Sequence, residues 1–465
     1  MSAASKSAGA AASAQSSLKR ELGATLALGW PIILANLAIN VMTATDFMML
    51  GRLSPHALAA GSLGFFLYQP LFLLGLGVVG ALSPIAAARI GAGQGADALR
   101  RATHQALISA LFFAVVVWIA LIGAVPFLLA IGEPADVAKD AGIYLKGFQW
   151  GLAPSLIYYA ARAAFSALER PRPPLVAGLL AVAFNALANY ALIFGKLGMP
   201  ALGIIGSGFA TTLSQTLMCA LLLAASLIDP RMRALRLFAP PWRLAGTELK
   251  ALWRLGLPIG AMIVAEVGVF ASATLVMGLF STAAIEAHTI ALQVASLAFM
   301  VPLGLGQAAT VRVGLAYGAG DARAISRSGW SAFGLTALFA VFSASAMIGA
   351  PRLLIAPFID VDAPANEGTV ALAIALLKVA ALFQIVDGSQ AALANMLRGV
   401  HDSRVPLIIA ILGYWAIGAP VGVALGFATP LGPVGVWIGL AAGLATVAVL
   451  LMRRWVVKQR QGFAV

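Results

Sequence analysis

The chain has 465 residues, of which 61% are hydrophobic and only 10% are charged. A soluble globular domain carries about 25% charged residues, so this composition excludes a soluble protein and predicts helices that span a lipid bilayer. The net charge of +13 does not indicate a nucleic-acid partner, because the basic residues lie in short loops between apolar stretches. The single cysteine, Cys219, excludes an internal disulfide and a cysteine-built metal site. We expect no structural metal and no cofactor.

Residues 1–17 are rich in alanine and serine, and we expect them to form a disordered tail. Twelve apolar stretches follow, each long enough to cross a bilayer as a helix. They cover residues 24–48, 57–82, 104–130, 142–167, 174–195, 205–228, 252–278, 285–311, 328–349, 368–397, 405–427 and 433–453. The sequence therefore predicts an all-α membrane protein with twelve transmembrane helices.

The distribution of basic residues predicts the orientation of these helices. If both termini lie in the cytoplasm, 24 of the 30 lysines and arginines fall on the cytoplasmic side. Cytoplasmic loops of membrane proteins carry such an excess of positive charge. We therefore expect a multi-pass protein of the bacterial inner membrane with both termini cytoplasmic.

An internal repeat relates the two halves of the chain. Residues 28–93 align without a gap on residues 255–320, at a shift of 227 positions. The identities include Pro31 with Pro258, Gly77 with Gly304, and the tripeptide at 91–93 with that at 318–320. Because the shift crosses six spans, both copies have the same orientation in the membrane, which makes the repeat a parallel one.

The repeat predicts two six-helix lobes with the substrate path between them, as in a transporter that alternates its access. We expect an N-lobe at 18–228, a polar and basic cytoplasmic linker at 229–251, a C-lobe at 252–455 and a cytoplasmic C-terminal tail at 456–465.

Carboxylates inside the spans are candidate functional groups, because a charge in the membrane costs several kcal/mol and is retained for a purpose. Asp46 lies in the first span, and Asn185 and Asn189 lie one helical turn apart in the fifth. With Thr211 of the sixth span, these residues form a candidate oxygen-rich site in the N-lobe for a proton or Na⁺.

The C-lobe offers a rival site. Glu266 lies in the seventh span and Asp387 in the tenth, within a polar stretch that also contains Gln384 and Ser389. The repeat places Ile39 opposite Glu266 and Ala273 opposite Asp46, so the two lobes do not share their acids. We infer from this difference that the lobes have different tasks.

Structural roles are the alternatives for each of these residues. Asp46 could be a helix-end residue at the outer interface near Arg52, and Glu266 and Asp387 could be held in structural hydrogen bonds. The two asparagines could join helices through amide hydrogen bonds.

Aromatic, methionine and polar residues at the expected lobe interface are candidate contacts for a drug, because such side chains make adaptable pockets. Core or lipid-facing packing is the alternative for each. The candidates are Tyr68, Tyr158, Met262, Gln293, Phe299 and Met300.

Several of these residues occur in segments that resemble one known family. The segments 288–295 (HTIALQVA) and 299–314 (FMVPLGLGQAATVRVG), followed by glycines at 318 and 320, are similar to the eighth helix of the multidrug and toxic compound extrusion (MATE) family. Thr45-Asp46, the pair Asn185 and Asn189, and Asp387 with Arg398 also fit its NorM-like bacterial branch. The resemblance covers residues 18–455.

The resemblance implies an antiporter that exports cationic or amphipathic drugs in exchange for Na⁺ or H⁺. It implies a cation site at Asp46, Asn185, Asn189 and Thr211 and a second one, for which Na⁺ is possible, at Glu266 and Asp387. We expect a monomer whose partners are small drugs and the lipid bilayer.

Two other classes of protein are alternatives. A flippase of lipid-linked sugars would need cationic residues in its cavity to hold a pyrophosphate, and the spans offer almost none. An enzyme would need a catalytic cluster, and we find neither a metal-ligand spacing nor a serine nucleophile with partners. The absence of a P-loop also excludes an ATP-driven pump. We therefore predict a transporter without catalytic residues.

Overall fold

The computed structural model describes the backbone of residues 3–463 and the side chains of residues 18–463. The regular structure of this part is helical throughout and contains no strand. Eleven of its helical segments are long and apolar enough to cross a membrane. The expected tail at 1–17 falls on residues whose side chains lie outside the described part, although the helix α1 is continuous from Ala3 to Leu53.

The expected count of twelve spans is not reproduced, because the fourth one is interrupted. Residues 142–167 belong to α6 (Ala135–Phe148), a 3₁₀ turn at Gln149–Gly151 and α7 (Leu152–Ala167). Neither helix alone reaches the 18 residues that a candidate span requires. Gly151 lies close to α9, since a Cβ there would approach the side chain of Gln215 and the backbone of Thr212.

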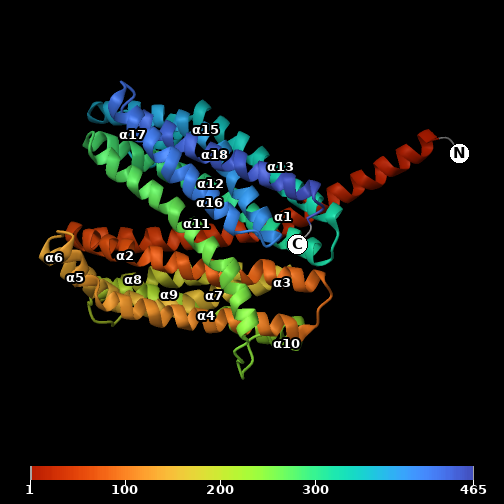
Figure 1. Ribbon diagram of the computed structural model, residues 1–465. Helices are drawn as coiled ribbons and strands as arrows, with labels where there is room; N and C mark the ends of the chain where they lie inside the picture. Colours follow the sequence, from red (N-terminus) through yellow and green to blue (C-terminus); the bar gives the residue numbers. More distant parts are fainter. Residues whose placement is uncertain (1–2, 464–465) are drawn as a thin grey trace. The chain divides into compact units, whose positions relative to one another are not determined.

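The chain divides into two compact units. We call residues Leu34–Ala261 the N-unit, and Met1–Ile33 together with Met262–Val465 the C-unit. Within the N-unit, α8 packs on α9, α7 packs on both α4 and α9, and α6 lies between α2 and α9 (Figure 1). Its remaining helices are α2 (Pro55–Gly80), α3 (Leu82–Gly91), α4 (Ala96–Ile122), α5 (Ala124–Ala130), α8 (Arg172–Phe194), α9 (Ile204–Ile228) and α10 (Pro230–Leu235).

In the C-unit, α15 packs against α12, α13 and α18, which makes it the helix with the most helical neighbours in this unit. A π-helical segment, Leu412–Gly418, interrupts the span that begins with α16. The helices are α12 (Thr282–Gly318), α13 (Ala322–Gly349), α14 (Pro351–Ile355), α15 (Glu367–Gly399), α16 (Arg404–Ile411), α17 (Ala419–Ala428) and α18 (Pro433–Arg460), with a 3₁₀ turn at Pro364–Asn366.

The boundaries between the units lie inside two helices and differ from the expected lobe limits of 18–228 and 252–455. The first boundary falls within α1, and the second falls within α11 (Gly246–Gly278). The start of α1 belongs to the C-unit because Gly29 packs against Leu305 of α12. The start of α11 belongs to the N-unit because Gly260 packs against the backbone of α2 at Leu74.

The internal repeat is visible in the local structure of both halves. Ser54 caps α2 by accepting the N–H of Ala57, and Ser281 caps α12 by accepting the N–H of Ala284. Gly93 and Gly320, which also lie 227 positions apart, have φ values of 67° and 68°. Only glycine adopts this left-handed backbone readily, so the repeat has kept its glycine where the chain turns.

Candidate functional site

Asp46 of α1 is a buried carboxylate that three side chains approach. It is 4% exposed. Its Oδ1 accepts hydrogen bonds from Nδ2 of Asn185 at 2.9 Å and from Nδ2 of Asn189 at 2.6 Å. Its Oδ2 accepts a hydrogen bond from the hydroxyl of Thr211 at 2.8 Å. The structure thus brings together the four residues that the sequence analysis assigns to the N-lobe site.

The helices account for this convergence. Asn185 and Asn189 are four residues apart on α8, so both amides project from one face toward α1. Thr211 rather than Thr212 reaches Asp46, because consecutive residues of α9 point in directions about 100° apart. The hydroxyl of Thr212 donates instead to the backbone oxygen of Gly147 at 2.8 Å.

The site around Asp46 has negative charge without a compensating cation. Within the described residues, no lysine, arginine or histidine forms an ion pair with this carboxylate. The amide oxygens of Asn185 and Asn189 and the hydroxyl oxygen of Ser207 are buried and have no hydrogen-bond partner. A buried acceptor without a partner is unfavourable, so these oxygen atoms suit a cation that enters beside Asp46.

A cavity of about 240 Å³ adjoins Asp46 in the N-unit. Its wall contains the carboxylate, the rings of Tyr68, Phe72 and Phe148, and the amide of Gln69. The full lining is Ile39, Asn40, Met42, Thr43, Asp46, Phe47, Phe65, Tyr68, Gln69, Phe72, Leu73, Tyr144, Phe148, Ser155, Tyr159, Thr211, Gln215 and Met218. The lining contains no lysine or arginine, so one carboxylate determines the charge of this cavity.

A second polar cluster lies in the C-unit. Glu266 of α11 interacts electrostatically with Asp387 and Arg398 of α15, and the side chain of Gln390 lies beside its carboxylate. Tyr414 interacts with both acids and with Arg398. The structure therefore brings Glu266 and Asp387 into one cluster.

This cluster also contains buried polar atoms without partners. They are Oδ1 of Asp387, Oε1 of Gln390 and the hydroxyl of Tyr414. Both polar atoms of Gln384, which precedes Asp387 by three residues on α15, are also buried without a partner. Ser389, in contrast, donates to the backbone oxygen of Ile385 on its own helix at 2.7 Å. The cluster offers carboxylate, amide and phenol oxygens, which are the ligand types that hard cations prefer.

The predicted drug contacts have different environments. Tyr68 lines the cavity. Tyr158 is buried in the core, where its hydroxyl donates to the backbone oxygen of Pro174 at 3.0 Å, and the neighbouring Tyr159 lines the cavity instead. Met262 is buried in the core of the C-unit.

The other three candidates lie on α12 and do not line this cavity, whose wall comes from residues 39–218. Gln293 is exposed, whereas Phe299 and Met300 are partly buried.

Sequence reasoning missed several members of both clusters. Gln390 lies three residues after Asp387 on one helical face, so helical spacing could have identified it. Ser207 could have been found in the same way, four residues before Thr211. Tyr414 gives no such signal, because its position depends on the π-helical segment, a distortion that often occurs at functional sites.

In the part of the chain whose side chains are described, no group of three or more histidine, cysteine, aspartate and glutamate residues is arranged to hold a metal ion. The two clusters described above are built from only one or two carboxylates with amides and hydroxyls.

A protein-family profile matches most of the chain, in two segments. The profile of the MatE family matches residues 31–191 and again residues 258–424. The two matches begin 227 positions apart, which is the shift of the internal repeat.

Curated relatives match nearly the whole chain. The probable multidrug resistance protein NorM of Mesorhizobium japonicum is 47% identical over 443 residues, which cover 95% of each chain. The protein of the same name from Brucella suis biovar 1 is 42% identical over 437 residues, covering 94% of this chain and 93% of the relative.

Solved structures share the fold. One of them is the outward-facing conformation of a multidrug resistance MATE family transporter of the MOP superfamily. It matches with a TM-score of 0.84 at 20% identity, over 95% of this chain and 96% of that one. The prediction of an all-α, MATE-like membrane fold with an internal repeat is confirmed.

Proposed function

Because the chain belongs to the MatE family, we propose that this multi-pass membrane protein exports cationic and amphipathic drugs in exchange for Na⁺ or H⁺. It acts as a monomer in the bacterial inner membrane, with both termini in the cytoplasm. The relatives named as probable multidrug resistance proteins support multidrug efflux. The excess of basic residues on one side of the spans supports the orientation.

The observation that carries the proposal is the buried carboxylate of Asp46, which has no ion-pair partner among the described residues and lies in the wall of a cavity lined by aromatic rings. The carboxylate attracts a cation, and the rings of residues such as Tyr68 and Phe72 favour a flat or amphipathic one through cation–π and apolar contacts. A cavity with these walls can hold many different drugs because its contacts are mostly non-directional.

Coupling follows from competition for the same negative charge. A proton or Na⁺ that binds beside Asp46 neutralises the carboxylate and removes most of its attraction for a cationic drug. The drug then leaves while the site is open to the outside. A ligand shifts the conformational equilibrium only through its different affinity for the two states. Exchange therefore requires that the drug and the coupling ion favour different states.

The cluster of Glu266 and Asp387 provides a second site for the coupling ion in the C-unit. The oxygen atoms without partners on Asp387, Gln390 and Tyr414 would ligate Na⁺. Arg398 compensates part of the negative charge of Glu266. This arrangement supports the binding of a monovalent cation rather than a divalent one.

The charge of the cavity argues against a flippase of lipid-linked sugars. Such a protein must hold a pyrophosphate, for which Lys and Arg are the usual ligands. The lining around Asp46 contains neither residue and carries a negative charge instead.

Proteoliposomes test the proposal. The purified protein is reconstituted, the vesicles are equilibrated with the fluorescent cation ethidium at equal concentration on both sides, and a Na⁺ gradient or a pH gradient is imposed in turn. We expect one of the two gradients to drive ethidium transport against its own gradient. Transport that responds to neither would contradict the antiporter.

A further inference from the structure

The segment of residues 229–254, which we call the basic segment, comprises α10 and the start of α11 and joins the two copies of the repeat. Six of its residues are basic and two, Asp229 and Glu248, are acidic. Neither the drug site nor the proposed coupling sites use this segment.

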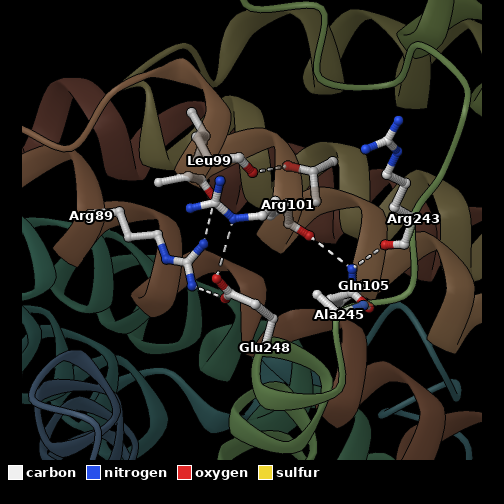
Figure 2. Close-up of polar contacts among 9 residues, drawn as sticks. Arg89, Leu99, Arg101, Gln105, Arg243, Ala245 and Glu248 are labelled. Carbon is white, nitrogen blue, oxygen red and sulfur yellow. Dashed lines mark hydrogen bonds and ion pairs between the residues drawn. The ribbon is translucent and has the colours of Figure 1, made fainter.

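Arginines of the N-unit outside the segment neutralise both acids of the basic segment. Asp229 forms an ion pair with Arg170. Glu248 forms ion pairs with Arg89 of α3 and, at 3.6 Å, with Arg101 of α4 (Figure 2). The negative charges of the segment are therefore compensated from within the N-unit and leave its own basic residues uncompensated.

The basic side chains of the segment all face solvent. In the described part of the chain, none of them has an acidic partner within ion-pair distance. The six are Arg231, Arg233, Arg236, Arg243, Lys250 and Arg254. Six positive charges without a counter-charge on one short segment create a strong local field that favours an anionic partner.

Hydrogen bonds hold the backbone of the segment in place around Leu244. The amide of Gln105 donates through Nε2 to the backbone oxygen of Arg243 at 2.9 Å, and its Oε1 accepts the N–H of Ala245 at 3.2 Å. Gln105 thus binds the backbone on both sides of Leu244. Figure 2 shows Gln105 beside the backbone of Arg243 and Ala245, with the guanidinium of Arg243 directed away from Gln105.

Apolar side chains are exposed beside these charges. Leu244 is 67% exposed and Trp242 is 38% exposed. Tryptophan is enriched at the boundary between lipid and water. Basic residues mixed with Trp and Leu are typical of segments that bind the membrane surface, where the apolar groups insert and the charges meet anionic headgroups.

We propose that the basic segment is a docking surface for anionic phospholipids of the cytoplasmic leaflet, with Leu244 and Trp242 inserted among the headgroups. The proposal rests on the cytoplasmic orientation given above and is independent of the drug and of the coupling ion. Positive charge complements the negative surface potential of this leaflet, and the fixed backbone lowers the entropic cost of binding.

Site-directed quenching tests the docking surface in the full-length protein. Cys219 is the only cysteine, so a Cys219→Ser background with Leu244→Cys carries a single fluorophore. The protein is reconstituted in vesicles of phosphatidylcholine and phosphatidylglycerol, and bromine is placed on the chains of one lipid or the other. We expect brominated phosphatidylglycerol to quench the label more strongly than equal amounts of brominated phosphatidylcholine.

Charge removal then tests the role of the arginines. Each basic residue near an anionic surface adds a comparable increment of binding free energy, so the triple substitution Arg233→Gln, Arg236→Gln and Arg243→Gln should lower the preference for phosphatidylglycerol on the order of tenfold or more. The matched control is Arg323→Gln, Arg453→Gln and Arg460→Gln, which removes three exposed arginines of the C-unit.

Equal quenching by both lipids would overturn the proposal, and so would a control triple that lowers the preference as much as the triple in the basic segment. Melting temperatures in detergent verify that both triples are folded. Because the readout needs neither a drug nor an ion gradient, failure of the antiporter proposal would leave this result unchanged.

Discussion

His288 and Asp46 are both buried polar residues, but their hydrogen bonds give them different roles. Nδ1 of His288 lies 3.1 Å from Nε1 of Trp437, which can only donate, so Nδ1 is an unprotonated acceptor. Nε2 therefore carries the proton and donates to the hydroxyl oxygen of Thr274 at 3.0 Å. Every polar atom of this neutral ring has a partner. His288 is structural, whereas the oxygen atoms near Asp46 lack partners.

Substitution of His288 should therefore reduce stability rather than change transport specificity. His288→Ala leaves the indole N–H of Trp437 buried without an acceptor, which costs about 1–3 kcal/mol. We expect a lower melting temperature in detergent and normal ethidium transport by the protein that remains folded. His56→Ala is the control, since its side chain is 42% exposed and should melt like wild type. Unchanged stability with lost transport would contradict the structural role.

Thr211 and Thr212 are a matched pair for testing the site at Asp46. Thr211→Val removes a hydrogen-bond donor from the carboxylate, whereas Thr212→Val removes one from the backbone of Gly147. Because a hydrogen bond to a charged group contributes about 1.5–3 kcal/mol, the Asp46 carboxylate in Thr211→Val should bind a proton about tenfold more tightly. Na⁺ would instead lose a hydroxyl ligand and bind more weakly. The half-saturating ion concentration for transport measures this effect. Equal half-saturating ion concentrations for Thr211→Val and Thr212→Val would contradict the assignment of Thr211 to the ion site at Asp46.

At the scale of the helices, two acids bind α1 and α11 to neighbouring helices of their own units. Glu21 accepts two hydrogen bonds from Arg312, at 2.9 and 2.7 Å, and one from Ser328 at 2.8 Å. Glu248, which lies 227 positions later, pairs with Arg89 and Arg101. Ser328 and Arg101 also lie 227 positions apart. The repeat has kept the acid and changed its partners.

Loss of the acid at Glu21 should destabilise the C-unit. Glu21→Gln leaves Arg312 partly buried without its bidentate partner, which costs roughly 3 kcal/mol. Asp97→Asn is the control because that side chain is 81% exposed, and its pair with Arg100 contributes at most about 1 kcal/mol. In detergent, the melting temperature of Glu21→Gln should be clearly lower than that of Asp97→Asn. Similar melting temperatures would show that the bonds of Glu21 add little.

Close packing of α2 on α11 depends on two glycines. A Cβ on Gly77 would meet the backbone of Gly260, whereas a Cβ on Gly80 of the same helix would meet nothing within 4 Å. Small residues allow such close approach of membrane helices. We expect Gly77→Ala to lower the yield and melting temperature of the folded protein and Gly80→Ala to be neutral. A stable Gly77→Ala protein would mean that the helices can separate at no cost.

The sequence predicted these helices well wherever hydrophobic length determined the outcome. It did not predict the break at Gln149–Gly151 or the π-helical segment at Leu412–Gly418, since both depend on packing against neighbouring helices. The same reason explains the unit boundaries inside α1 and α11. A helix is continuous in hydropathy even where its two halves pack on different partners.

For the whole molecule, the repeat and the intramembrane acids were accessible from the sequence, because identities at fixed spacing and charges in apolar spans are visible there. Tyr158 and Tyr159 mark the limit of this reasoning. They are adjacent, and only the rotation of α7 decides that Tyr159 lines the cavity while Tyr158 binds Pro174. The roles of the two acidic clusters in coupling remain predictions.

The most direct test of the account compares ethidium transport by wild type, Asp46→Asn and Asp387→Asn in proteoliposomes under an imposed Na⁺ gradient at equal pH, and then under a pH gradient without Na⁺. We predict that one gradient drives transport by the wild type and that at least one substitution abolishes this coupling in a protein that remains folded. Transport by both variants at the wild-type rate under the driving gradient would contradict the assignment of the coupling ion to these carboxylates.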